Sequence, residues 1–494
     1  MASTFAPGLP LLPLLLWEPP PGLELILAQE GVPFVRVRDA HPLAFGTGRF
    51  VLYDGRRIGS AMVRARLGPT HVAINIDALR RAEPIDPFAA LIDTKAARAT
   101  WRIGALALTE RVARRDKAAI RRRLLARLRE AVNGAGGLWA RLAPYPFPYR
   151  SAFNFRADLD EHFPDDYARF ARARKPLDGC STHFLNTHAY GQDRRVLDDL
   201  AGLDVQSHAH FHVIYRNEDA NRRNLDRAHA LLVKGGFDPV GFAAPEGRWN
   251  PGLDRVIEDL GYVYSSDFQL GYDDFPFFPW RDGRFSTVLQ VPIHPICEGL
   301  FLEAGANGRA VAEHLVSVVR AKVASGEPAF VYGHPERRLA HCPEVLAALA
   351  DEVAGNPLLW RVPLTRFVHW WRWRANRRWG MVARGQGQYE VQFDDWDARH
   401  RLALEVVRGG HVASLPLTAP RTTLRLEGLA YERRTRVDLP APALTSRPHS
   451  LKSFMRAALD WETVTPIEDL PDGTLTDRFR KRLRRWKQEG GKRS

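Results

Sequence analysis

A regular alternation of short apolar runs and helix-like segments between residues 153 and 364 constrains the fold more than any other feature. The expected strands are residues 153–157, 181–185, 203–206, 240–244, 262–266, 288–292, 329–333 and 360–364. Helix-like segments separate most of them, for example residues 219–235, 250–260 and 308–324. Seven or eight β–α units within about 220 residues fit a closed or nearly closed parallel barrel better than an open sheet.

The segments on either side of this alternation have other patterns. Apolar and helix-like stretches over residues 1–145 predict a small α/β domain, in which the apolar residues 9–17 form a buried strand. The proline-rich connector at 143–150 marks its end, so the barrel is expected over 146–374. Short strand-like runs predict an antiparallel β domain over 375–470, and a basic tail follows at 471–494.

The charge is unevenly distributed. The formal net charge is +14, and nine Lys or Arg residues against Asp477 and Glu489 give the last 21 residues +7 of it. A second basic stretch is a predicted helix with apolar Ile120, Leu124 and Leu128 on one face, and the arginines between them indicate a solvated basic face. A high positive charge alone does not identify the binding partner, and binding to a specific nucleic acid is not expected.

The tail itself is interpreted as a short helix that Thr476 caps and that carries Phe479, Leu483 and Trp486 on one face. Such a helix either frays in solvent or rests on an anionic membrane surface. The N-terminus lacks the positive segment of a secretory signal, and no stretch approaches about 20 uninterrupted apolar residues. The expected location is therefore the cytoplasm or the cytoplasmic face of the membrane. Three cysteines without a CxxC pair indicate neither a disulfide framework nor a thiolate zinc site.

Ionisable residues follow five of the expected strands, where a parallel barrel places its catalytic groups. They are Asp158 and Asp160 after the first strand, His208 and His212 after the third, Glu246 and Arg248 with their neighbours Pro245 and Gly247 after the fourth, Asp267 after the fifth, and His334 after the seventh. Loops at the carboxyl ends of parallel strands converge on one mouth. We therefore expect these residues at a common rim.

Their chemistry suits a hydrolase that uses a divalent metal. Asp160, His208 and His212 offer the carboxylate and imidazole ligands that zinc accepts, with cobalt, nickel or manganese as alternatives. Asp158 is placed to act as the general base toward water, and His334, from another strand, to protonate the leaving amine as the general acid.

The successive motifs FRADLDE, QSHAHFH, FAAPEGRWN, YSSDF and VYGHP resemble those of the polysaccharide deacetylase (NodB-homology, carbohydrate esterase) family, over about residues 153–370. The resemblance implies a distorted (β/α) barrel that hydrolyses an N-acetyl group on an amino sugar or glycan. It implies the same roles for Asp158, Asp160, His208, His212 and His334. It also leaves His210 at a variable position.

One position departs from the family pattern. The third motif usually begins with an arginine that neutralises and orients the base, whereas this chain has Ala243 there. Arg156 and Arg248 are the candidates to supply the charge, and Arg156 is favoured because residues two apart on a strand share a face. The backbone N–H groups of Glu246 and Gly247 are expected to contribute to oxyanion stabilisation.

Two other functions stay open. His208 and His210 form a His-x-His pair such as two-metal cyclic amidases of the amidohydrolase type carry, although that pair is expected after the first strand and not the third. Alternatively, the loss of the motif arginine leaves a catalytically impaired glycan-binding protein, in which aromatic residues such as Trp249, Trp280 and Trp370 stack on sugar rings.

Overall fold

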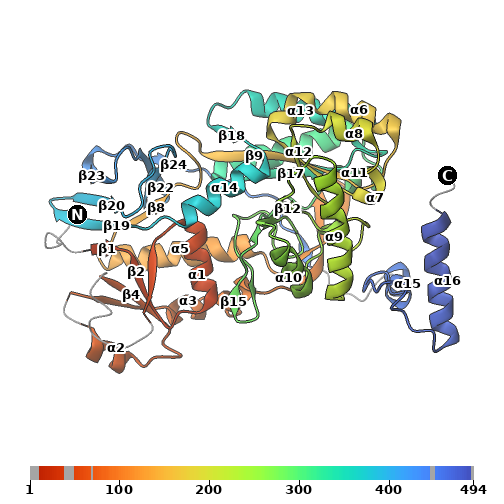
Figure 1. The fold of residues 1–494 in the computed structure, drawn as a ribbon. Coiled ribbons are helices and arrows are strands. Elements are labelled where there is room, and N and C mark those ends of the chain that lie inside the picture. The colour runs from red at the N-terminus through yellow and green to blue at the C-terminus, as the bar shows by residue number, and fades with distance from the viewer. Residues whose placement is uncertain (1–9, 38–48, 68–69, 445–450, 491–494) are drawn as a thin grey trace.

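The computed structural model describes residues 10–37, 49–67, 70–444 and 451–490 (Figure 1). The eight strands expected between residues 153 and 364 all form and join one parallel sheet in the order β16-β13-β12-β11-β10-β9-β17, with β18 beside the start of β9. Their bounds are β9 Ser151–Leu159, β10 Ser181–Leu185, β11 Asp204–Ser207, β12 Gly241–Phe242, β13 Tyr264–Ser265, β16 Leu289–Gln290, β17 Ala329–Gly333 and β18 Leu359–Arg361. The predicted barrel is therefore confirmed.

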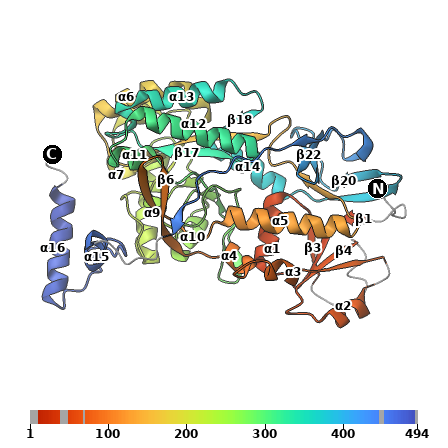
Figure 2. The same cartoon turned by 180° about the vertical axis from the view of Figure 1, so that it is seen from behind.

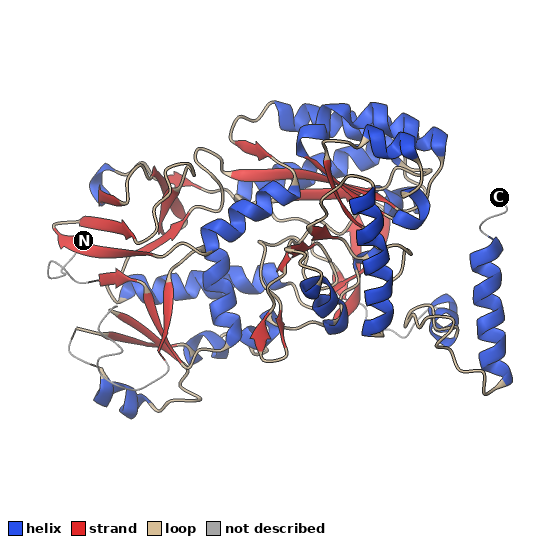
Figure 3. Cartoon of the chain, in the orientation of Figure 1, coloured by secondary structure: helices blue, strands red, loops and turns tan. Residues whose placement is uncertain are grey.

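The barrel is distorted at the seam between the two end strands of the sheet, β16 and β17. Strand pairing runs from β16 round to β17, and across the seam the N–H of His294 donates to the carbonyl of Phe330 at 2.9 Å. Helices lie outside the curled sheet (Figure 3). They are α6 Pro164–Arg174, α7 Thr187–Tyr190, α8 Arg194–Asp199, α9 Glu218–Lys234, α10 Pro251–Asp259, α11 Glu298–Glu303, α12 Gly308–Ser325, α13 Pro343–Ala354 and α14 Leu364–Ala375.

Local sequence explains these elements. Every residue of β9 and of β10 is buried, as expected of strands covered on both faces. Asn217, Asn250 and Asn307 cap α9, α10 and α12, since each side chain accepts a hydrogen bond from the backbone N–H three residues on. The three helices expected from the sequence thus start and end within a few residues of their observed bounds.

The N-terminal region contains a second parallel sheet, in the order β3-β2-β4-β5. Its elements are β2 Leu14–Trp17, α1 Pro21–Glu30, β3 Phe34–Val37, β4 Phe50–Tyr53, α2 Ser60–Arg66, β5 Val72–Asn75, α3 Asp77–Arg81, α4 Pro87–Leu91 and α5 Lys117–Gly134. The prediction of one strand over residues 9–17 is wrong for the described part. Pro13 separates β1 (Pro10–Leu12) from β2, and the two strands join different sheets.

The interpretation of the α5 arginines as a solvated face holds for some of them, such as Arg123 with 49% of its side chain exposed, but not for Arg121. Arg121 is buried and pairs with Glu30 at 2.8 Å and with Asp274 at 2.7 Å. Arg123 and Arg127 both pair with Glu83. These acids lie far from α5 in sequence, so charge spacing within the helix did not reveal them.

Antiparallel strands follow the barrel and pair with strands from the N-terminal region. Pairing runs β1-β19-β20-β23 in one sheet, β24-β22-β21-β8 in another and β25-β6-β7 in a third. Their bounds are β6 Ala96–Ile103, β7 Leu106–Ala113, β8 Trp139–Leu142, β19 Trp379–Gly385, β20 Gln388–Phe393, β21 Ala403–Arg408, β22 His411–Pro416, β23 Arg421–Arg425, β24 Glu432–Arg433 and β25 Ala443–Leu444. These pairings cross the boundaries expected near residues 145 and 375, and the division into domains stays a prediction.

A small hairpin and two helices complete the chain. The hairpin is β14 (Trp280–Arg281) with β15 (Arg284–Phe285), and the helices are α15 (Leu451–Ala458) and α16 (Leu475–Gly490). In both Figure 1 and Figure 2, α16 stands at the edge of the molecule. Among the described helices, none is long and apolar enough to cross a membrane.

Candidate active site

Strand β9 brings three of the predicted site residues to one face of the barrel. Arg156 and Asp158 lie on the strand and Asp160 directly follows it, so their spacing of two residues directs all three side chains to the same side. Arg156 and Asp158 are buried, whereas the side chain of Asp160 keeps 20% of its surface exposed. Asp160 is thus the member of the set that opens to the mouth.

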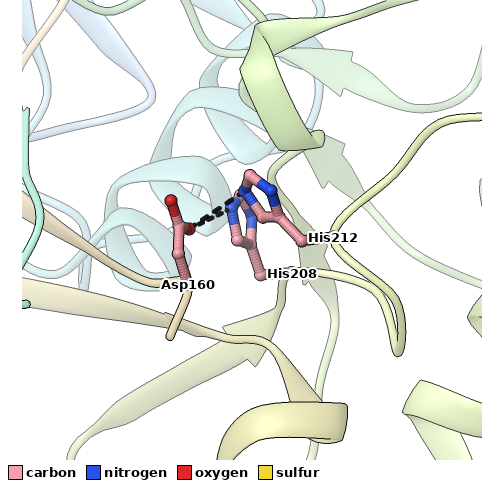
Figure 4. Close-up of side chains that lie close together, drawn as sticks. All are labelled: Asp160, His208 and His212. Atoms are coloured by element: carbon pink, nitrogen blue, oxygen red, sulfur yellow. Dashed lines mark ion pairs between the residues drawn. The ribbon is translucent and has the colours of Figure 1, made fainter. Parts of the chain in front are cut away.

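Asp160, His208 and His212 meet at one point (Figure 4). The Oδ1 atom of Asp160 lies 3.0 Å from Nε2 of His208 and 3.1 Å from Nε2 of His212. One ligand atom from each residue lies within 4.8 Å of the other two. The sequence expected these three side chains to converge, and the structure brings them together.

The hydrogen bonding of this group fits a cation. Nδ1 of His208 lies 2.7 Å from the carbonyl oxygen of Ala243, which only accepts, so Nδ1 carries a proton, and when the ring is neutral its lone pair is on Nε2. That lone pair faces Oδ1 of Asp160, which is buried and has no hydrogen-bond partner among the described residues. Two lone pairs aimed at each other repel unless a cation lies between them. The residues present therefore fit a divalent metal.

Charge interactions within the group shift the pKa values of Asp160 and His212 in opposite directions. Burial alone would raise the pKa of Asp160, but the charge of the neighbouring His212 holds it well below its usual range. Burial would likewise lower the pKa of His212, although its side chain is 33% exposed, and the charge of Asp160 more than restores it. Asp160 is thus an anion at neutral pH, as a metal ligand must be.

Asp158 forms a buried ion pair with Arg156. Nε of Arg156 donates to Oδ1 of Asp158 at 2.6 Å, and Nη2 donates to Oδ2. Nη1 of the same guanidinium donates to the carbonyl of Ser266 at 2.6 Å. Burial lowers the pKa of Arg156 and Asp158 more than restores it. Arg156, and not Arg248, therefore provides the positive charge next to Asp158.

His334 faces the same centre from β17, with Nε2 3.8 Å from Oδ2 of Asp160. Its Nδ1 atom and its backbone N–H both lie 2.8 Å from Oε1 of Glu298, which is fully buried. Burial lowers the pKa of His334, but Glu298 raises it well above the ordinary value. Gly333 permits this contact, because a Cβ there would lie 2.6 Å from the Glu298 carboxylate. Cys297 also lies near His334, and the Glu298 hydrogen bond explains that cluster without an ion.

The segment Pro245–Gly247 forms a tight turn at the rim. Glu246 has a φ of 56° and Gly247 of 59°. The N–H of Gly247 donates to the carbonyl of Ala244 at 2.8 Å, so the expected oxyanion contribution of this N–H is wrong for this conformation. Arg248 pairs with Glu246 at 2.6 Å. An oxyanion role for Glu246 stays a prediction.

Asp267 is hydrogen-bonded within the barrel and is not one of the residues that meet at Asp160. Oδ1 of Asp267 accepts a hydrogen bond from the N–H of Ala244 at 2.8 Å, and Oδ2 accepts one from Ser265. The side chain is fully buried, and burial raises the pKa of Asp267 to about 7. Its position indicates that it fixes the turn that follows Ala244, and a direct substrate contact stays a prediction.

The residues on which the alternatives depended lie elsewhere. His210 turns away from Asp160, and its Nδ1 lies 3.0 Å from the hydroxyl of Thr187. Trp370 is buried, and its indole N–H donates to the carbonyl of Pro144. Trp280 packs its ring against Phe285 at 4.8 Å between centroids. These contacts favour neither a His208–His210 metal pair nor sugar stacking on Trp370.

Sequence reasoning missed Glu298, Ser266 and the carbonyl of Ala243. Glu298 precedes His334 by 36 residues, and no motif joins the two. The contributions of Ser266 and Ala243 come from backbone carbonyls, for which residue type gives no signal. Only the packing of the barrel brings these groups to the site.

No family model and no curated protein matches the chain. Among solved structures, a candidate polysaccharide deacetylase from Mycobacterium smegmatis is 19% identical with a TM-score of 0.38, over 47% of this chain and 94% of the other. A family 4 carbohydrate esterase from Streptomyces lividans is 14% identical with a TM-score of 0.30, over 44% and 92%. A CE4 family pseudoenzyme from Bacillus anthracis is 14% identical with a TM-score of 0.32, over 46% and 70%.

Proposed function

We propose that this chain is a metal-dependent hydrolase that removes an N-acetyl group from an amino sugar or glycan. The observation that carries the proposal is the meeting of Asp160 Oδ1 with Nε2 of His208 and of His212 at 3.0 and 3.1 Å. A carboxylate and two imidazoles are a three-ligand set typical of catalytic zinc, and such a set leaves positions open for reactants. Cobalt, nickel and manganese are alternatives.

Each residue has a role that follows from its contacts. A divalent ion held by Asp160, His208 and His212 would supply Lewis acidity toward the acetyl carbonyl and a water molecule. Asp158, held by Arg156, accepts the proton that the attacking water loses as its oxygen bonds to the acyl carbon. His334 then gives its Nε2 proton to the nitrogen as the C–N bond breaks, and Glu298 balances the charge of the protonated ring. The products are acetate and the free amine.

The test is an acetate-release assay with the full chain on a panel of N-acetylated glycans, first after chelation and then with zinc or cobalt added back. We expect release only with added metal, and none from Asp158→Asn. Release by chelated protein, or by Asp158→Asn at the parent's rate, would contradict the mechanism. Absence of release from every glycan with every metal would favour the glycan-binding alternative.

We also propose that α16 rests on an anionic membrane surface at the cytoplasmic face. In support, Phe479 and Trp486 are 58% and 71% exposed on a helix rich in Arg and Lys. Apolar side chains within a cationic helix suit binding to anionic lipid. The hydroxyl of Thr474, not of Thr476 as expected, accepts from the N–H of Asp477 and caps the helix.

Sedimentation with vesicles of anionic or neutral phospholipid tests this surface. The full chain is expected to sediment with anionic vesicles only, and a chain lacking residues 474–494 with neither. Equal sedimentation of the two chains would contradict the proposal.

A further inference from the structure

The hairpin of β6 and β7 lies beside the catalytic centre, although it belongs to the N-terminal region. β7 packs against α11, the helix that begins with Glu298. The N–H of Ala113, at the end of β7, donates to the carbonyl of Phe268 at 3.1 Å. Burial raises the pKa of Glu110 to about 7, and the charges of Glu246 and His334 both act on this carboxyl. Figure 2 shows β6 on the same side of the molecule as α11. The hairpin therefore borders the mouth of the site.

Three arginines gather where this hairpin meets the rim. Arg98 on β6 and Arg111 on β7 are directly opposite partners in the antiparallel pair. Partial burial lowers the pKa of Arg111, Glu462 raises it, and the charges of Arg248 and Arg98 lower it further. Like charges directly opposite each other destabilise a sheet. This arrangement is unfavourable unless an anion is shared between them.

Glu462 is that anion in this structure. Its carboxylate lies 3.0 Å from Nη2 of Arg98 and 3.8 Å from Nη1 of Arg111, and its backbone carbonyl accepts from Nη1 of Arg248 at 2.9 Å. The side chain of Glu462 is 12% exposed, whereas those of Arg98 and Arg111 are 38% and 45% exposed. Glu462 comes from the connection between α15 and α16, so a segment remote in sequence brings a carboxylate to the mouth.

We propose that Arg98, Arg111 and Arg248 form an anion-binding subsite at the mouth of the catalytic centre, which takes a phosphate or carboxylate on the substrate in place of Glu462. Guanidinium groups bind both anions through paired N–H donors. More than a third of each of the Arg98 and Arg111 side chains is exposed, and ion pairs of such side chains contribute little to stability. The need to hold the connection between α15 and α16 does not by itself explain two opposed arginines. The inference rests on the proposed deacetylase function, and it narrows the substrate to an N-acetylated sugar that bears an anionic group.

Binding is measured first, by isothermal titration of the full chain with N-acetylglucosamine 1-phosphate, N-acetylmuramic acid and uncharged N-acetylglucosamine. We expect the two anionic sugars to bind at least tenfold more tightly than the neutral one, and the phosphate and carboxylate arms identify the preferred anion. The double variant Arg98→Gln/Arg111→Gln should lose about tenfold or more of that preference, in the range of charge-assisted hydrogen bonds. Arg102→Gln is the control, because Arg102 is exposed on the same face of β6, about 13 Å farther along.

Glu462→Gln removes the internal competitor and should tighten binding of the anionic sugars severalfold while leaving the neutral sugar unaffected. Equal affinity for charged and neutral sugars in the parent, or full retention of the preference in Arg98→Gln/Arg111→Gln, would overturn the subsite. This measurement does not need turnover. Failure of acetate release with a preserved anion preference would therefore count against the hydrolase and not against the subsite.

Discussion

The ion pair between Arg156 and Asp158 gives the sharpest test of the site. Arg156→Met keeps an apolar stem in a place that is 1% exposed and removes both hydrogen bonds to the Asp158 carboxylate. Breaking a buried pair leaves one charge without a partner, which costs about 3 to 5 kcal/mol of the free energy of unfolding. The free energy of unfolding of folded proteins is about 5 to 15 kcal/mol in total. The variant should therefore fold, but it should unfold at a clearly lower urea concentration than the parent.

Activity should fall with stability, because the carboxylate that accepts the water proton loses the group that orients it. We expect kcat/KM for acetate release to drop about 100-fold, the lower end of what a general base contributes. Arg156→Lys keeps the charge without the two-pronged contact, and should recover part of both losses. Arg320→Met is the control, since Arg320 forms an exposed pair with Glu352 at 2.7 Å and its removal should cost less than about 1 kcal/mol.

The reasoning also requires that the two residues be coupled. In the double variant Arg156→Met/Asp158→Asn no charge is left unpaired, so the unfolding free energies of the single variants should not add, with a coupling on the order of 1 to 3 kcal/mol. The coupling is measured from the urea midpoints of the parent, the two single variants and the double variant, followed by tryptophan fluorescence. Strict additivity, or an Arg156→Met midpoint equal to that of Arg320→Met, would refute the buried pair.

Three further predictions address the metal, the acid and the fold. His212→Ala should lose bound metal after dialysis, whereas His210→Ala should retain about one ion by metal analysis; the reverse would favour the two-metal alternative. Glu298→Gln should lower kcat about 10- to 100-fold with little change in KM. It should also move the alkaline limb of the pH profile to lower pH, because Glu298 raises the pKa of His334 against the effect of burial. An alkaline limb that does not move would contradict this role. Burial raises the pKa of Glu405, but Arg434 and Arg141 lower it to about 2, so its stabilising effect is present above about pH 4.5 and is lost as the pH falls toward 2. The urea midpoint of Glu405→Gln should therefore depend less on pH across this range than that of the parent. An identical dependence would exclude the ion pairs of Glu405 with Arg434 and Arg141.

The sequence predicted the barrel and most of its rim for a local reason. An apolar run that ends in a polar residue marks the carboxyl end of a buried strand, and parallel strands place those ends together. Asp158 and Asp160 follow β9, and His208 and His212 follow β11 four residues apart, so their meeting could be expected without coordinates. The choice of Arg156 over Arg248 followed from the same period of two along β9.

Tertiary structure alone decided the contacts between segments far apart in the chain. Glu298 reaches His334 only because α11 packs beside the end of β17, and Glu462 meets Arg98 only because the chain returns past the barrel to the β6–β7 hairpin. The α5 arginines look solvated in sequence, yet Arg121 is buried between two acids from other elements. Periodicity and residue type describe which face of an element is apolar, but they carry no information on which distant element covers that face. Which charged side chains come into contact depends on how distant elements pack. This packing determined the surroundings of His334, the proposed general acid, and of the mouth of the site.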